Sequence, residues 1–152
     1  FRALDWSRVG LAGHSLGGYT VLGIAGAWPK WQDARIKAVL ALSPYAMPYI
    51  YQHTLGMIDV PVMYQGGTND FAITPFVEAQ NGAYDETPAP KYFVDLDGAG
   101  HFAWTDLRAA YQGTIEAYSV AFFDAYLKGK AFPPALLGGQ GQVAGIRYQA
   151  RP

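Results

Sequence analysis

A tight glycine-rich turn around Ser15 constrains the fold of this chain more than any other feature. The turn, Gly-His-Ser-Leu-Gly-Gly at residues 13–18, follows an apolar stretch and precedes small and apolar residues that extend to Trp28. This order predicts a strand, a sharp turn and a helix, because glycines on either side of the serine relieve crowding in a strained turn. At this turn, the N-terminus of the expected helix and the backbone N–H of Leu16 favour negative charge beside Ser15. We therefore expect a nucleophilic serine, with a buried structural serine as the alternative.

The rest of the chain alternates between apolar runs and helical segments. Strands separated by helices favour a parallel sheet with helices on both faces, and nearly continuous apolar runs suit strands covered on both sides. We therefore expect an α/β fold with a parallel sheet of about four strands flanked by helices. The expected strands are residues 9–13, 36–42, 60–65 and 91–95, and the expected helices are 19–28, 74–82 and 105–128.

Two polar side chains follow the third and fourth expected strands. Asp70 lies in the loop after the third strand, and His101 lies in the loop after the fourth. In such sheets the chemistry takes place beyond the carboxyl ends of the strands. A serine hydroxyl needs a base to take its proton, and the base needs a third group to orient it. The chain order Ser15, Asp70, His101 is the order associated with this turn, so we expect a catalytic triad.

The other two histidines fit the role of base less well. His14 lies inside the turn, where we expect it to pack beside the serine, and His53 lies in an aromatic loop, where a surface or packing role is expected. His101 is therefore the predicted base.

The rival acids are also less suitable than Asp70. Asp59 precedes its strand and so lies at the wrong end of the sheet. Asp95 and Asp97 are close to His101 in the sequence, which leaves them only a local turn contact. The segment after the second strand, Ser43-Pro44-Tyr45, offers no carboxylate. For Asp70 the remaining alternative is a loop aspartate that caps the following helix.

Composition excludes several classes of protein. The 152 residues are 51% hydrophobic and 15% charged, which indicates a globular chain. A net charge of −1 with scattered basic residues gives no reason to expect nucleic acid as a partner. No apolar run reaches the ~18–20 residues of a transmembrane helix. The chain has no cysteine, which excludes a disulfide scaffold, a cysteine nucleophile and a thiolate zinc site; we expect neither a metal nor a cofactor.

Three stretches together resemble the carboxyl-terminal half of an α/β-hydrolase. They are GHSLGGYTVLGIAGAW, VPVMYQGGTNDFAITP and DGAGHFAWTDL. The resemblance is to the dienelactone-hydrolase-like branch, which also contains platelet-activating-factor acetylhydrolase-like and cutinase-like polyester hydrolases. It implies a serine esterase acting on a small-molecule ester, with Ser15 as nucleophile, His101 as proton shuttle, Asp70 orienting His101, and the Leu16 N–H in the oxyanion hole. Dienelactone hydrolases use a cysteine where Ser15 stands, so lactone specificity is not implied.

The chain departs from the family in lacking the strands that normally precede the nucleophile strand. A second oxyanion donor normally comes from that half, and losing one donor typically costs ~10²–10³ in rate. The strand at residues 9–13 is then an exposed apolar edge. A homodimer, the chain's own tail or a missing N-terminal half are the three candidates to cover it. We expect a truncated hydrolase-like domain at 1–130 and a tail at 131–152, with residues 142–149 either an edge strand or loosely held.

Aromatic side chains are frequent, at 15% of residues. Tyr45 and Phe102 follow the second and fourth expected strands, so we expect them to line an apolar acyl pocket, with ordinary packing as the alternative. The competing function is that of a catalytically weak or inactive module whose bare sheet edge recruits another chain.

Overall fold

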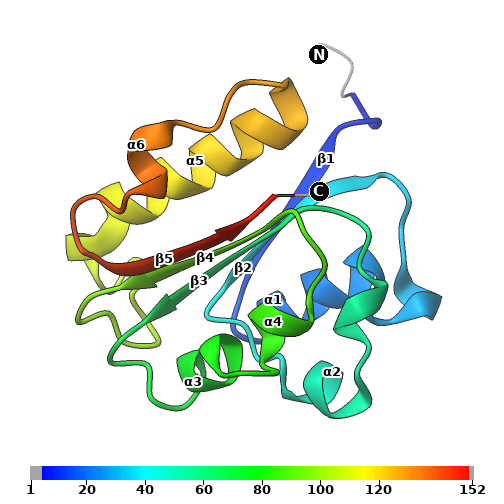
Figure 1. Cartoon of the computed structure of the whole chain (residues 1–152), viewed down its shortest axis with the longest axis horizontal. Helices are drawn as coiled ribbons and strands as arrows, with labels where there is room; N and C mark the ends of the chain where they lie inside the picture. Colours follow the sequence, from blue (N-terminus) through cyan, green and yellow to red (C-terminus); the bar gives the residue numbers. More distant parts are fainter. Residues whose placement is uncertain (1–4, 151–152) are drawn as a thin grey trace.

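The computed structural model describes residues 5–150 and forms one five-stranded sheet with helices on both faces (Figure 1). The strand order is β1-β2-β3-β4-β5, in which β1 to β4 run parallel and β5 is antiparallel to β4. The expected α/β fold is confirmed, with one strand more than expected. The strands are β1 Val9–His14, β2 Ile36–Leu42, β3 Val62–Gly67, β4 Lys91–Leu96 and β5 Val143–Gln149.

The helices form two layers. In Figure 1, α5 and α6 cover one face of the sheet, and α1 to α4 lie on the other. The α-helices are α1 Leu16–Leu22, α2 Met47–Gln52, α3 Thr74–Glu78, α4 Ala83–Glu86, α5 Gln112–Lys128 and α6 Pro134–Leu137. A π-helical turn, Gly23–Ala27, prolongs α1, and short 3₁₀ turns occupy Pro29–Trp31, Leu55–Met57 and Ala109–Tyr111. None of the helices within residues 5–150 is long and apolar enough to cross a membrane.

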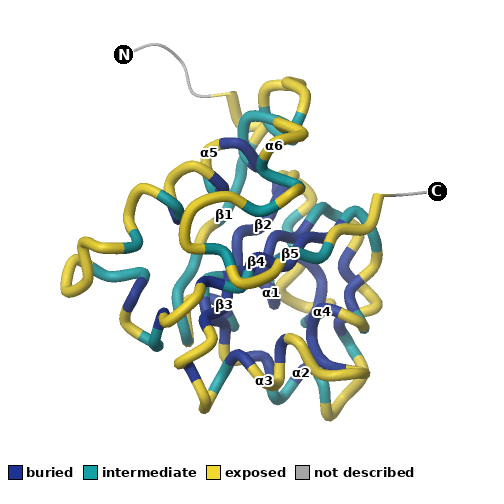
Figure 2. The backbone as a smooth tube through the Cα atoms, turned by 60° about the vertical axis from the view of Figure 1, so that its left-hand side comes forward, coloured by how far each residue is buried: buried dark blue, intermediate teal, exposed yellow. Residues whose placement is uncertain are grey.

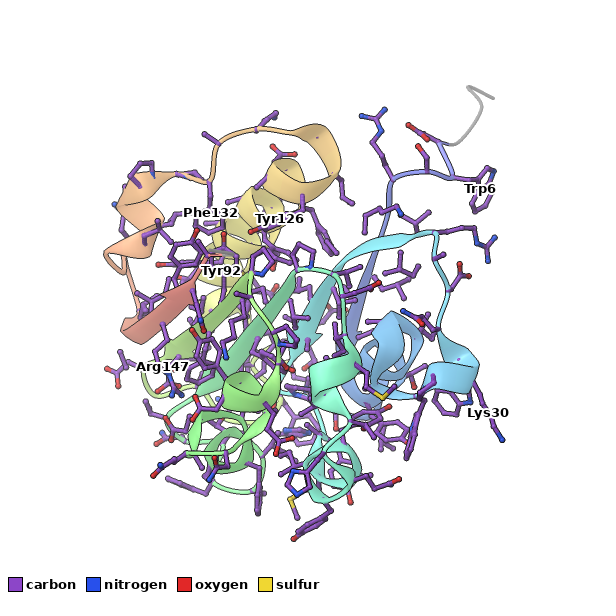
Figure 3. All side chains as sticks on the ribbon, turned by 45° about the vertical axis from the view of Figure 1, so that its right-hand side comes forward. Trp6, Lys30, Tyr92, Tyr126, Phe132 and Arg147 are labelled. Atoms are coloured by element: carbon purple, nitrogen blue, oxygen red, sulfur yellow. The ribbon has the colours of Figure 1, made fainter. Side chains whose placement is uncertain are left out.

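Burial follows position in the sheet. All six residues of β3 are buried, as are most residues of β2 and β4, whereas β1 and β5 are largely half-buried or exposed (Figure 2). Inner strands of a parallel sheet are covered on both faces, which is why their sequences are continuously apolar. On the α5 side, the Tyr92 ring stacks on Phe132 at 4.9 Å and lies 6.2 Å from Tyr126, and Figure 3 shows these three side chains gathered there.

The two edges of the sheet differ. β5, from the expected tail, pairs with β4 and so covers the β4 side, while β1 lies at the opposite edge with only β2 beside it among the described strands. The nucleophile-turn strand is therefore an edge strand, as expected. The described part of the tail, residues 131–150, does not cover it. Residues 1–4 and 151–152, the ends of the expected domain ranges, lie outside the described residues, and the division at residue 130 stays a prediction.

Two expected helices were wrong in extent. The helix expected at 74–82 ends at Glu78, because Ala79 has a non-helical ψ of 156° and Asn81 a φ of 61°, and a second short helix begins only at Ala83. The helix expected at 105–128 is α5, which begins at Gln112 and not at Thr105. The Thr105 hydroxyl makes local bonds with the Phe102 carbonyl and the Leu107 N–H, which favour a turn over a helix.

Candidate active site

Ser15 lies in a strained turn between β1 and α1. Its backbone has φ 55° and ψ −115°, an unusual conformation for a residue with a side chain. The turn is closed by backbone bonds: the Ser15 carbonyl accepts from the N–H groups of Tyr19 and Tyr45, both at 3.1 Å. This geometry holds the serine at the carboxyl end of the sheet and at the start of a helix.

The glycines of the turn have different roles. A Cβ on Gly13 would lie 2.2 Å from the Gly17 carbonyl oxygen, and a Cβ on Gly18 would lie 2.5 Å from the Pro44 Cβ. A Cβ on Gly17 would meet no atom within 4 Å outside its own helix backbone. Gly13 and Gly18 are therefore the positions where only glycine fits. The expectation that Gly17 relieves crowding through its own missing side chain was wrong, because the close approach is to its backbone.

Asp70 lies in a tight turn after β3 and is 3% exposed. Its N–H donates to the Gly67 carbonyl at 2.9 Å, and its own carbonyl accepts from the Thr74 N–H at 3.0 Å. The side chain makes no capping hydrogen bond to α3; its Oδ2 lies 3.0 Å from Nδ1 of His101. The carboxylate thus faces the imidazole, and the capping alternative does not describe its side chain.

His101 connects the other two residues. Its Nε2 lies 2.9 Å from Ser15 Oγ, so hydroxyl, imidazole and carboxylate form one hydrogen-bonded row. The loop that carries it is anchored nearby, because the Trp104 indole N–H donates to the buried Gln65 side chain on β3 at 3.0 Å. The structure therefore brings together the three residues that the sequence predicts as a triad.

His14, the last residue of β1, contacts the same loop. Its Nε2 lies 2.7 Å from the His101 carbonyl oxygen, and the two rings are 4.8 Å apart. Since a carbonyl only accepts, Nε2 of His14 carries the proton. Burial lowers the pKa of His14, offset in part by the bond to this carbonyl. His14 thus packs beside the serine turn as expected, and it also holds the backbone of His101.

Ser43, the residue after β2, is the side chain that sequence reasoning missed. Ser43 is fully buried. Its Oγ hydrogen-bonds to Asp70 Oδ2, and the Ser43 Oγ also lies 2.9 Å from Nδ1 of His101. The sequence argument considers only carboxylates in this segment, and Ser43 carries a hydroxyl. Its position at a strand end, level with the loops of Ser15 and Asp70, was the available signal.

The expected pocket residues border the row from different sides. The Phe102 ring lies 5.4 Å from the His101 ring and is 59% exposed. Tyr45, 38% exposed, is tied to Ser15 through its backbone N–H. Leu16 is the first residue of α1, where N–H groups have no intrahelical partner. A cavity of about 290 Å³ lies beside His101 and Phe102, with Asn69, Arg108 and Tyr111 also on its wall.

The rival residues lie elsewhere or have other partners. His53 is exposed and pairs with Glu86 at 2.8 Å. The pKa of Asp95 is raised to about 6, mainly by burial and further by the charges of Glu78 and Asp97, while the charge of Arg147 lowers it in part. Within the described part of the chain, no cluster of three or more histidine or acidic side chains is suited to hold a metal ion.

Comparison with known proteins shows which family the chain resembles. The family model described as PETase, PET hydrolase-like, matches residues 2–132. The chain is 30% identical to Cutinase est2 of Thermobifida alba over 126 residues, which are 82% of this chain and 37% of the relative. It is also 30% identical over 102 residues, 66% of the chain, to Cutinase 1 of Thermobifida cellulosilytica and to the cutinase of Thermobifida fusca (strain YX), covering 35% and 31% of those proteins.

The chain thus spans about a third of the length of the curated relatives that it matches. Of the three groups named in the expected resemblance, the matches are to the cutinase-like one. Neither the matches nor the structure support a homodimer or a module that serves only association. The family model covers most of the chain, and the matched residues form the parallel strands β1 to β4. The chain therefore belongs to the PET hydrolase-like, cutinase-like family of the α/β-hydrolase superfamily.

Proposed function

We propose that the chain carries the catalytic centre of a serine carboxylic-ester hydrolase, with Ser15 as nucleophile, His101 as general base and acid, and Asp70 as the orienting carboxylate. The observation that carries this proposal is the row of hydrogen bonds from Ser15 Oγ to His101 Nε2 at 2.9 Å and from His101 Nδ1 to Asp70 Oδ2 at 3.0 Å. Membership of a family whose named relatives are cutinases supports the ester as the substrate class.

The chemistry follows from the proton positions. Asp70 accepts the Nδ1–H of His101, which leaves Nε2 free to take the proton of Ser15 as its oxygen attacks the ester carbonyl. His101 then gives this proton to the leaving alcohol, and an acyl group remains on Ser15. A water molecule, deprotonated by His101, attacks the acyl-enzyme and releases the carboxylic acid and the free serine.

Negative charge develops on the carbonyl oxygen at each attack. We propose that the Leu16 N–H, at the start of α1, donates a hydrogen bond to it. The argument is local: α1 follows Ser15 directly, and the first N–H groups of a helix have no partner within it.

The aromatic rings near the row favour an apolar substituent on the ester. Tyr45 and Phe102 are partly exposed, and they flank the serine turn and the histidine loop respectively. We therefore propose that these two side chains contact the acyl or alcohol part of a small-molecule ester.

The test is covalent labelling combined with turnover. We expect a fluorophosphonate probe to label Ser15, and a short-chain nitrophenyl ester to be hydrolysed with a rate that Ser15→Ala removes. Ser7→Ala is the matched control, because Ser7 is exposed and bonds only to its neighbour Asp5 in the described contacts; it should label and turn over like the unaltered chain. Folded protein that takes no label on Ser15, or turnover that survives Ser15→Ala, would contradict the proposal.

A further inference from the structure

We propose that Ser43 is a positioning residue for the hydrolysis: its buried hydroxyl bridges Asp70 and His101 and fixes both side chains in the orientation that leaves His101 Nε2 facing Ser15. The inference deepens the proposed function and rests on it. Among the described residues, the Ser43 hydroxyl bonds to Asp70 and His101 and not to Ser15, and its full burial keeps it from a bound substrate.

The bridge is defined by atoms from three separate loops. Ser43 Oγ bonds to Oδ2 of Asp70 and lies 2.9 Å from Nδ1 of His101. The same Oδ2 lies 3.0 Å from the same Nδ1. The hydroxyl oxygen, the carboxylate oxygen and the ring nitrogen therefore form a closed triangle of contacts, and not a chain with a free end.

Accounting for protons gives each contact a direction. A carboxylate only accepts, so Ser43 donates its hydroxyl proton to Asp70. The Ser43 oxygen is then an acceptor toward His101, as Asp70 is, so the Nδ1–H is shared between two oxygens. A proton on Nδ1 leaves Nε2 of the neutral ring without one. The bridge therefore favours the tautomer that can accept the Ser15 proton.

The backbone of Ser43 supports a specific placement of this hydroxyl. Its φ is 41°, a left-handed value that is uncommon for a residue with a side chain, and the residue precedes Pro44, which further disfavours helical conformations. The Ser43 N–H donates to the Gln65 carbonyl on β3 at 2.7 Å, and two residues later the Tyr45 N–H donates to Ser15. A strained conformation persists only where its surroundings hold it, and here the surroundings are β3 and the serine turn.

The consequence is rotational restraint on two side chains at once. Without the hydroxyl, Asp70 Oδ2 loses one donor and the His101 Nδ1–H loses one of two acceptors. The hydrogen bonds that remain to His101 are those of its ring with Asp70 and Ser15 and that of its carbonyl with His14. We therefore expect loss of Ser43 to lower the fraction of molecules in which His101 is aligned, which reduces the rate of the chemical steps and leaves substrate binding unchanged.

The experiment compares variants at Ser43 with one at another buried hydroxyl. Ser43→Ala should lower kcat about ten-fold, the scale of one hydrogen bond to a charged group, with KM within two-fold of the unaltered chain. Ser43→Gly, which also relieves the positive φ, should be equally impaired, and Ser43→Thr, which keeps the hydroxyl, should recover kcat to within about three-fold. The control is Thr87→Val, because Thr87 is buried and bonds to Tyr64 and to the Ala83 carbonyl, away from the triad; its kcat should be unchanged.

The outcomes separate this inference from the proposed function. If Ser15→Ala abolishes turnover while Ser43→Ala and Ser43→Gly keep kcat within two-fold, the inference is wrong and the proposed function stands. If KM rises and kcat does not fall, Ser43 acts on substrate and the positioning role is also wrong.

A second measurement needs no turnover. The Nδ1–H proton of His101, observed by NMR in ¹⁵N-labelled protein, should exchange with solvent several-fold faster in Ser43→Ala than in the unaltered chain. Equal exchange rates and equal chemical shifts in the two proteins would overturn the bridge even if no ester were ever hydrolysed.

Discussion

The two ends of the same sheet differ in chemistry and in shape. At the carboxyl ends of the strands, Ser15, His101 and Asp70 form a hydrogen-bonded row, and His101 also lines a cavity of about 290 Å³. At the amino ends, a larger cavity of about 630 Å³ is walled by residues that include Lys37 and Asp33. A choice by size would therefore select the wrong end.

Polar groups at the amino end already have local partners. Asp33 pairs with Arg35 at 2.5 Å, and Lys37 Nζ donates to the Ala34 carbonyl at 2.8 Å. Among residues 5–150, no serine or histidine lines this cavity. At the carboxyl end, by contrast, side chains from three different loops bond to one another. Strand polarity and convergent side chains, and not volume, therefore identify the candidate site.

The largest expected effect is at Asp70. Asp70→Asn keeps the shape of the side chain but loses its charge, and its amide nitrogen can present a donor to Nδ1, which favours the wrong tautomer of His101. We expect kcat/KM for a nitrophenyl ester to fall by ~10³–10⁴. Asp97→Asn is the control, an exposed carboxylate at the same end of the sheet whose activity should stay within two-fold. A loss at Asp97 equal to that at Asp70 would mean that the acid has been misassigned.

The turn around Ser15 should show the next largest effect, on stability. Gly13→Ala places a methyl group 2.2 Å from the Gly17 carbonyl oxygen, so the turn must shift. We expect the free energy of unfolding, measured in urea, to fall by about 3 kcal/mol. Gly17→Ala is the matched control, since its Cβ meets open space; it should be neutral or stabilising by up to about 1 kcal/mol. Equal losses in both variants would contradict the close approach.

A pair of substitutions at His14 tests how the histidine loop is held. His14→Gln keeps a donor for the His101 carbonyl and should retain most activity, whereas His14→Phe loses it and should lower kcat about ten-fold.

The same pair of variants gives a pH signature. Because burial lowers the pKa of His14 in the folded chain, the unfolded chain binds this proton more readily. The contribution of neutral His14 to the free energy of unfolding is therefore fully present above about pH 6.5, the ordinary histidine pKa. It is lost as the pH falls below that value toward the lowered pKa of the folded chain. Urea unfolding of both variants between pH 7.5 and 5.5 should show a smaller decline than that of the unaltered chain. Equal declines would place the titrating group elsewhere.

Asp95 carries the next prediction, with the opposite sign. Burial, with repulsion from Glu78 and Asp97, raises its pKa from 3.8 to about 6, and its Oδ1 has no hydrogen-bond partner among the described residues. The folded chain holds the carboxyl proton of Asp95 more tightly than the unfolded chain does. The contribution of this protonated carboxyl to the free energy of unfolding is therefore lost as the pH rises from about 4 through 6. Asp95→Asn should raise the free energy of unfolding, measured in urea, by about 1 kcal/mol at pH 8, a value that allows for solvent screening. Near pH 4 the substitution should leave the free energy of unfolding unchanged. A gain of equal size at both values would exclude ionisation as its cause.

The sequence predicted the sheet well because strand pattern and strand polarity are local signals. β2 matches its expected residues, whereas β3 runs two residues past Gln65, since Gly66 and Gly67 continue to pair with β4. Once the strands are parallel, the loops that follow them must meet at one edge, which is why Asp70 and His101 could be selected.

The contact of Ser43 could not be predicted in the same way. A residue before proline is expected to be extended, yet Ser43 has a φ of 41°. That conformation is held by Gln65 on β3 and, through Tyr45, by the turn at Ser15, partners distant in the sequence. The start of α5 was misjudged for a similar reason, because hydrogen bonds of Thr105 outweigh its helical pattern.

The smallest expected effect returns to the amino end of the sheet. Asp33→Asn and Lys37→Gln remove charges from the wall of the larger cavity and break only exposed or local contacts. Exposed ion pairs contribute little to stability, and this end of the sheet is separated from Ser15 by the length of the strands. Both variants should therefore hydrolyse a nitrophenyl ester within two-fold of the unaltered rate. If either one lowered kcat/KM ten-fold without lowering the melting temperature, the larger cavity would have to take part in the reaction, and strand polarity would no longer suffice to locate the chemistry.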